Sequence, residues 1–191
     1  MPAPAGLWRR AGEPVAAHEI AQALLDGDAY ARTRGVAQQA ARLARTARLP
    51  RDARARLLAA AWLHDLSPAG APRQGARALR RAGHEPLARL VAHRRFAAME
   101  AAIRGLPPLA AEFPVPRGAD EGLLMLLDIA QVTTDGAGAP CTPATALRGL
   151  VERVGPRDPA VRALVALVSR LGEDPTARAL VEMLAPRPAV R

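Results

Sequence analysis

Apolar residues recur at helical spacing along most of the chain, in segments that proline and glycine separate. Leu57, Ala61 and His64, for example, share one helix face. The pattern predicts helices at about 15–25, 28–49, 52–66, 72–82, 86–105 and 120–132, and others that begin after Thr142, Asp158 and Asp174. The helix at 86–105 has a break near Arg94. No segment makes a convincing strand, so we expect an all-α fold.

Capping residues set the expected boundaries of these helices. Asp28 and Asp52 stand at N-cap positions, and Pro50 stops the helix between them. Two later segments echo each other, Asp158-Pro159 and Asp174-Pro175, each with aspartate at the N-cap and proline at the first helical position. Each pair therefore predicts the start of a helix.

The connecting segments divide the chain into three parts. Residues 106–118 contain four prolines and are expected to form an extended surface loop, and 133–140 a glycine-rich loop. We expect a loose N-terminal arm (1–14), one helical domain (15–185) and a short tail (186–191).

Composition agrees with a single helical domain. The chain has 191 residues, of which 50% are hydrophobic and only 3% aromatic. Alanine and leucine, both strong helix formers, dominate the apolar set. Such a composition predicts a thin, closely packed core.

Charge and cysteine content narrow the function classes. The net charge is +9, and every basic side chain is arginine. Because the arginines are spread over most of the predicted helices without interleaved aromatics, this balance does not favour a nucleic-acid partner. Cys141 is the single cysteine and is read as an incidental thiol. No apolar run is long enough for a signal peptide or a membrane span, so we expect a cytoplasmic protein.

The candidate chemistry begins with His64-Asp65, at the end of an alanine- and leucine-rich helix. An imidazole nitrogen and a carboxylate oxygen are both ligands for divalent metals. A His-Asp pair alone is structural more often than not, so its context decides.

That context resembles the HD superfamily of metal-dependent phosphohydrolases. Residues 60–65 are similar to the family's AAxLHD helix end, and 32–37 to its HxxGVA helix. Further segments resemble a bacterial branch with GAxxL, LVAHH, EFP, DMTT and YGP motifs; they lie at 75–79, 90–94, 112–114, 131–134 and 155–156. The similarity covers about residues 28–170. It implies a single HD-type helical domain with a helical C-terminal extension.

The resemblance also implies a metal site, which this sequence matches in part. In such proteins a histidine, the His-Asp pair and a later aspartate hold a divalent metal such as Mn, Fe or Mg. The metal generates a hydroxide that attacks a phosphate ester. His64 and Asp65 match this set, but Arg32 stands in place of the first histidine and Gln131 in place of the later aspartate.

These departures favour a degenerate site. Arg32 shares a helix face with Val36 and should point inward, where a guanidinium needs an anion. We therefore expect Arg32 to pair with Asp65. The sequence then predicts a protein that binds a phosphorylated metabolite or nucleotide, or acts in regulation, with Arg32, His93, Arg94 and Gln131 in the pocket.

The alternative is an active divalent-metal phosphohydrolase. It would use His64, Asp65 and His93, with Asp128 as a substitute carboxylate one helical turn before Gln131. That turn offsets Asp128 by about 4.5 Å along the axis. For His93, however, the pattern favours a partly buried structural histidine over a metal ligand. The sequence specifies neither the oligomeric state nor the ligand.

Overall fold

The computed structural model describes residues 5–66, 73–94, 97–184 and 186, and within these ranges the chain is all-helical. The predicted all-α class is confirmed. The helices are α1 (Ala5–Arg9), α2 (Pro14–Leu24), α3 (Gly27–Thr46), α4 (Arg51–Leu63), α5 (Gln74–Arg81), α6 (Glu85–His93), α7 (Ala97–Ile103), α8 (Leu109–Glu112), α9 (Ala119–Val132), α10 (Pro143–Val154), α11 (Pro159–Glu173) and α12 (Pro175–Leu184). Thr134 and Pro140 form an isolated bridge. None of the described helices is long and apolar enough to cross a membrane.

Capping explains where the later helices begin. The side chains of Thr142, Asp158 and Asp174 each accept a hydrogen bond from a backbone N–H in the first turn that follows. For α3, however, Asp26 rather than Asp28 is the N-cap and accepts from the Ala29 N–H at 2.9 Å. Asp28 lies in the first turn instead, where a carboxylate stabilises the helix dipole.

The N-terminal segment differs from the loose arm that the sequence predicted. Residues Ala5–Arg9 form α1, and Ala11 is fully buried. Trp8 is partly buried against the core, and its carbonyl oxygen lies 3.0 Å from His84 Nε2. Apolar contact and this hydrogen bond together hold the segment on the domain.

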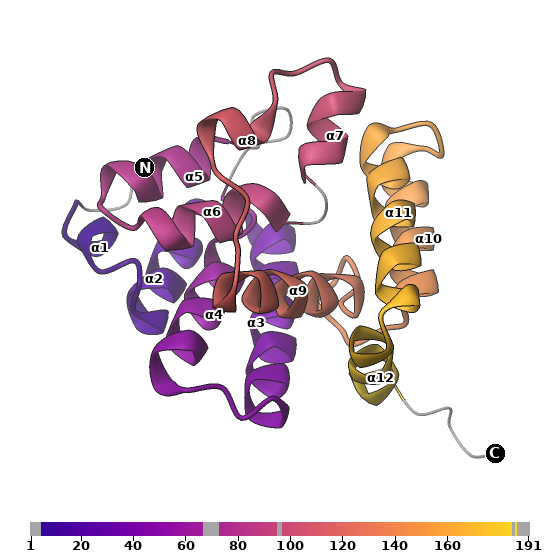
Figure 1. Cartoon of the computed structure of the whole chain (residues 1–191), viewed down its shortest axis with the longest axis horizontal. Helices are drawn as coiled ribbons and strands as arrows, with labels where there is room; N and C mark the ends of the chain where they lie inside the picture. Colours follow the sequence, from indigo (N-terminus) through magenta and orange to yellow (C-terminus); the bar gives the residue numbers. More distant parts are fainter. Residues whose placement is uncertain (1–4, 67–72, 95–96, 185, 187–191) are drawn as a thin grey trace.

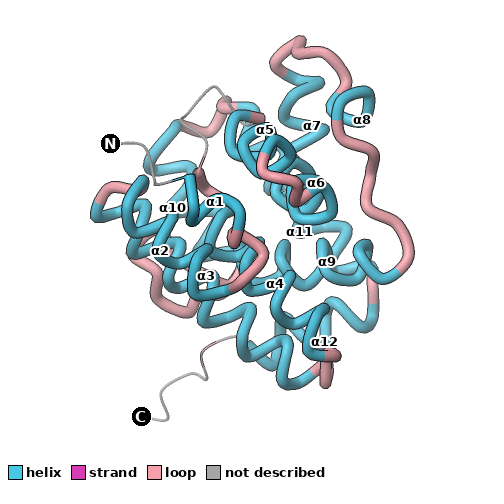
Figure 2. The backbone as a smooth tube through the Cα atoms, turned by 90° about the vertical axis from the view of Figure 1, so that its left-hand side faces the viewer, coloured by secondary structure: helices cyan, strands magenta, loops and turns pink. Residues whose placement is uncertain are grey.

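The proline-rich segment 106–118 also contains more structure than expected. Its prolines flank a one-turn helix, α8, because Leu109 and Phe113 are buried there. Arg80 lies over the Phe113 ring, 4.0 Å from its centroid, and donates to the Glu112 carbonyl at 2.6 Å. Tertiary contacts of this kind are not visible in local sequence. Figure 2 shows the connection from α8 to α9 along the outside of the molecule.

Helix α9 is the centre of the domain. It packs against α3, α4, α6, α10, α11 and α12, and every residue from Leu126 to Val132 is buried. Figure 1 shows α2–α6 on one side of α9 and the α10–α11 pair on the other. Side chains at the end of α9 are therefore close to both halves of the molecule.

Small side chains let α2, α3 and α4 pack closely. Ala17 and Ala21 of α2, Ala40 of α3, and Ala59 and Ala60 of α4 are each completely buried. Because alanine leaves little side-chain volume between helices, few large residues are needed to fill this layer.

The turn between α3 and α4 has an unusual backbone. Arg48 has φ of +50° and is the only non-glycine residue in the described ranges with a positive φ. Its N–H donates to the Arg45 carbonyl, and the Leu49 N–H donates to the Ala44 carbonyl. This is a left-handed helix end, a position at which glycine or asparagine is usual.

Candidate functional site

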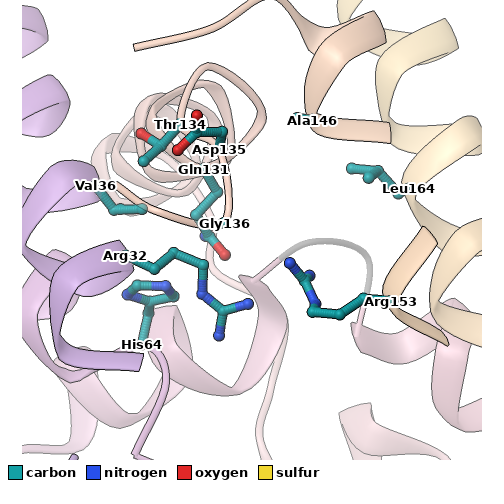
Figure 3. Close-up of a pocket in the computed structure, with 10 residues that line it drawn as sticks. All are labelled: Arg32, Val36, His64, Gln131, Thr134, Asp135, Gly136, Ala146, Arg153 and Leu164. Carbon is teal, nitrogen blue, oxygen red and sulfur yellow. The ribbon is translucent and has the colours of Figure 1, made fainter. Parts of the chain in front are cut away.

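Helices α3, α4 and α9 bring three of the predicted site residues to a small cavity. Arg32 of α3, His64 at the end of α4 and Gln131 of α9 all line it. The loop after α9, two residues of α10 and Leu164 of α11 complete the wall. The cavity volume is about 20 Å³, room for about one water-sized group. Its lining residues are Arg32, Val36, His64, Gln131, Thr134, Asp135, Gly136, Ala146, Arg153 and Leu164 (Figure 3).

Two glycines fix the loop against α3. A Cβ atom on Gly35 would lie 2.2 Å from the Gly138 carbonyl oxygen, and one on Gly138 would lie 2.2 Å from the Ala31 carbonyl oxygen. Gly138 also has φ of +86°, in the left-handed region. Only glycine permits this close approach, and it holds residues 134–136 beside Arg32.

The Asp65 carboxylate is the negative charge around which the arginines on the α3 and α4 side of the site are arranged. Arg32 Nη2 donates to Asp65 Oδ2, so the expected pair is present. Arg94 adds a second guanidinium, with Nη2 3.7 Å from Asp65 Oδ1 and Nε donating to the His64 carbonyl oxygen. The Asp65 side chain is 14% exposed, so this carboxylate is largely removed from water.

Burial and nearby charges shift the pKa of Arg94 in opposite directions. Desolvation lowers the pKa of Arg94, while the charges of Glu100 and Asp128 raise it. Asp128 is itself buried on α9 and does not line the cavity. Its carboxylate therefore acts on Arg94, one turn away from the position that a substitute metal ligand would need.

The two predicted histidines have different surroundings. His64 is 1% exposed, and its Nδ1 lies 2.8 Å from the Ala61 carbonyl oxygen, which assigns the proton to Nδ1. His93 is buried outside the cavity, with Nε2 2.6 Å from the Phe113 carbonyl oxygen. Burial lowers the pKa of His93, and the hydrogen bond to Phe113 partly offsets that effect. His93 thus connects α6 to the end of α8.

Gln131 presents an acceptor with an unmet hydrogen bond. The side chain is buried, and Nε2 donates to the Leu127 carbonyl at 3.4 Å. Oε1 is also buried and has no hydrogen-bond partner among the described residues. A buried amide oxygen without a donor is costly, so this position suits a bound molecule that offers an N–H or O–H.

Arg153 was not predicted from the sequence. It lies in the last turn of α10, is exposed, and makes no hydrogen bond or ion pair with any residue in the described part of the chain. A Cβ on Gly136 would lie 2.9 Å from Arg153 Nη1, so the guanidinium rests on that glycine. Figure 3 shows the guanidinium groups of Arg32 and Arg153 pointing toward each other.

The acidic group on the wall is held by its own loop. Asp135 Oδ1 accepts from the N–H groups of Ala137 and Ala139, at 2.9 and 2.8 Å. Thr134 Oγ1 donates back to the Ala130 carbonyl at 2.8 Å. These bonds order the loop and engage two polar groups that face the cavity.

A divalent metal does not fit the side chains at this cavity. Arg32 and Arg94 contact the Asp65 carboxylate, His93 is directed to Phe113, and Gln131 offers a neutral amide. In the described ranges, no three His, Cys, Asp or Glu side chains form a group that could hold a metal ion. The cavity instead has a cation, Arg32, at the position where the resemblance places a metal-binding histidine.

Comparison of the chain with models of known protein families, with curated proteins and with solved structures finds no match in any of the three. The resemblance to the HD superfamily therefore depends on the motifs alone and stays a prediction. The all-helical architecture is compatible with it, since Arg32, His64 and Gln131 come from three helices that meet.

Proposed function

We propose that this chain is a degenerate HD-like domain that binds the phosphoryl group of a small molecule or nucleotide without a divalent metal. The observation that carries the proposal is the pair of guanidinium groups, Arg32 and Arg153, that face each other across one cavity. Asp65 offsets the charge of Arg32, but Arg153 has no ion pair with a described residue, and the guanidinium fork matches phosphate oxygens.

Gln131 supports a ligand that also carries a proton to donate. A phosphate monoester, with a second pKa of about 6, is mostly a dianion without a proton near neutral pH, whereas inorganic phosphate keeps an O–H group in both of its neutral-pH forms. That O–H group can donate to Gln131 Oε1 while the other oxygens accept from arginine. Sulfate offers the same charge and shape without the proton, so phosphate should bind more tightly than sulfate.

The small volume of the cavity requires the Arg153 side chain to move when a ligand binds. A space of about 20 Å³ is too small for a whole phosphoryl group. Arg153 is exposed and closes one side of the cavity, so its side chain must swing away to admit the ligand. It would then contact the bound oxygens from the solvent side.

The active phosphohydrolase is less well supported. It requires His64, Asp65 and His93 to act on one metal, whereas His93 is bonded to the Phe113 carbonyl and does not line the cavity. Asp128, the substitute carboxylate, also lies outside the lining.

Calorimetric titration with inorganic phosphate, AMP and sulfate tests the proposal. Phosphate or AMP should bind, sulfate more weakly, and Arg153→Gln should weaken phosphate binding by about 10- to 100-fold, the loss of one hydrogen bond to a charged group. Gln131→Leu should reduce the preference for phosphate over sulfate. Arg157→Gln removes an exposed arginine that does not line the cavity and serves as the control.

Two results would overturn the proposal. The first is that neither phosphate nor AMP binds the folded protein at millimolar concentration. The second is that both bind equally well to the parent and to Arg153→Gln. Binding that requires added Mn²⁺ and is lost in His64→Ala would support the metal-dependent alternative.

A further inference from the structure

The turn between α3 and α4 gathers five exposed arginines at one end of the molecule. They are Arg42, Arg45, Arg48, Arg51 and Arg54, and we call them the arginine tip. In Figure 1 this turn lies at the bottom, away from α7 and α8. The sequence suggested arginines dispersed over most of the helices, but the antiparallel pair of α3 and α4 places these five together.

The charge of the arginine tip is not neutralised within the described part of the chain. No carboxylate there forms an ion pair with any of the five, and Arg42 donates only to Gln39 Oε1, at 3.1 Å. Asp52 is the one acidic residue between positions 42 and 54. Arg56, just beyond, is paired with Asp120 and contributes to the fold.

The backbone at Arg48 gives a second, independent observation. Arg48 adopts a left-handed conformation with φ of +50°, in which a side chain is strained and glycine is not. Its side chain is exposed and forms no hydrogen bond with a described residue. Glycine at this position would therefore serve the fold as well as the strained arginine does, except for the charge at the helix end. Strain that the fold does not need is characteristic of functional positions.

The neighbouring side chains limit the kind of partner. Leu49 and Ala53 are partly buried against the core, and the remaining exposed residues of the turn are Thr46, Ala47, Pro50 and Asp52. The arginine tip thus has no aromatic ring for stacking on bases and no large apolar side chain for insertion into a bilayer. Met183 of α12, 43% exposed and bonded to Thr46, adds only one thioether beside it.

We infer that the arginine tip binds the phosphate backbone of double-stranded nucleic acid, without reading sequence. Guanidinium groups bind phosphate oxygens in a bidentate manner and are preferred to lysine for this purpose. Two adjacent helix ends are roughly 20 Å across, and a duplex presents one negative charge about every 1.7 Å along its axis. Five arginines on that width can each reach a phosphate. This function is independent of ligand binding at the cavity.

Fluorescence anisotropy with a short mixed-sequence DNA duplex tests the inference. The slope of log affinity against log salt should be roughly −4 to −5, because each neutralised phosphate contributes about −0.9. The triple change Arg45→Gln, Arg48→Gln and Arg51→Gln should make the slope shallower by roughly 2.7 and weaken binding about tenfold or more at low salt.

A charge-matched control separates the arginine tip from net charge. Arg148, Arg157 and Arg162 are exposed on and beside α10 and α11 and have no ion pair with a described residue. Changing these three to glutamine removes the same charge and should leave most of the salt slope in place. Because Arg48 has a special backbone, a second triple change at Arg42, Arg45 and Arg51 repeats the test with that residue kept.

The outcomes decide between this surface and its competitors. Equal loss in the tip and control variants would mean that diffuse positive charge attracts the duplex, and would overturn the inference. So would cosedimentation with phosphatidylserine vesicles that depends on the arginine tip, in the absence of duplex binding. Loss of DNA binding in the tip variants with phosphate binding retained would support the inference independently of the cavity.

Discussion

Asp65 lies between two guanidinium groups, and this arrangement determines what the site can do. Arg32 contacts one carboxylate oxygen and Arg94 approaches the other. A carboxylate held this way has little capacity left for a metal. Its structural importance is correspondingly large, because its removal leaves two largely buried cations without their shared anion.

Asp65→Ala should therefore destabilise the fold by about 3 kcal/mol, near the lower end of the range for a broken buried pair, since the pair is partly exposed. Urea unfolding followed by circular dichroism measures the loss. Asp52→Ala, an exposed aspartate at the other end of α4, is the control and should cost less than about 1 kcal/mol. Equal stability of Asp65→Ala and the parent would show that the pair contributes nothing.

The proposed HD-like site predicts that supplying the two absent ligands should create a metal site. The double change Arg32→His with Gln131→Asp removes the cation and adds a carboxylate at the cavity, and metal content should rise toward one ion per chain after dialysis against Mn²⁺. Elemental analysis by mass spectrometry measures it. Arg34→His with Gln38→Asp makes the same chemical changes at exposed positions of α3 and should bind little. A parent chain that already holds stoichiometric metal would contradict the degenerate reading.

Of the site, the sequence could predict the residues that belong to a motif. Arg32 and Asp65 were expected to pair from the inward helix face and the need for an anion, and they do. Arg153 could not be found this way, because it is one arginine among many and reaches the cavity only when α10 folds back beside Gly136. His93 was placed near the site by its motif, but its hydrogen bond to Phe113 depends on a loop about 20 residues away.

At the scale of elements, local chemistry identifies helix starts better than helices that depend on distant contacts. Thr142, Asp158 and Asp174 cap as predicted because a cap and its N–H partners lie within one turn. Helices α1 and α8 were missed because burial of residues such as Ala11 and Phe113 by other parts of the chain stabilises them. The N-cap of α3 is Asp26, two residues before the predicted Asp28, because its side chain accepts from the Ala29 N–H.

The contact between α3 and the loop after α9 gives a prediction at this scale. Gly35→Ala would place a Cβ 2.2 Å from the Gly138 carbonyl oxygen, so the loop must move, at a cost of about 3 kcal/mol. Gly149→Ala is the matched control, since a Cβ there meets nothing within 4 Å in the middle of α10. It should stabilise the chain by about 0.5–1 kcal/mol. Thermal melts of both variants test the pair, and equal effects would contradict the contact.

For the whole molecule, the central position of α9 predicts an uneven distribution of stability. Amides in the buried second half of α9 can open only when neighbours on both sides separate, whereas α12 packs at one edge against α9 and α11. Hydrogen exchange measured by mass spectrometry should show Leu126–Val132 exchanging most slowly, near the rate of global unfolding, and α12 considerably faster. Exchange of α9 as fast as that of α12 would indicate that the two halves unfold independently.

Under the proposed HD-like assignment, the shared carboxylate also limits how a metal site could arise in this chain. An aspartate introduced first at position 131 would meet Arg32, giving that guanidinium a second anion and strengthening its hold on the cavity. A histidine introduced first at position 32 would leave Asp65 beside Arg94, and the later aspartate would still be missing. Neither single substitution completes a ligand set, so selection for metal chemistry has no intermediate to favour. Under that assignment, the position of Arg32 favours functions that tolerate a permanent positive charge beside Asp65.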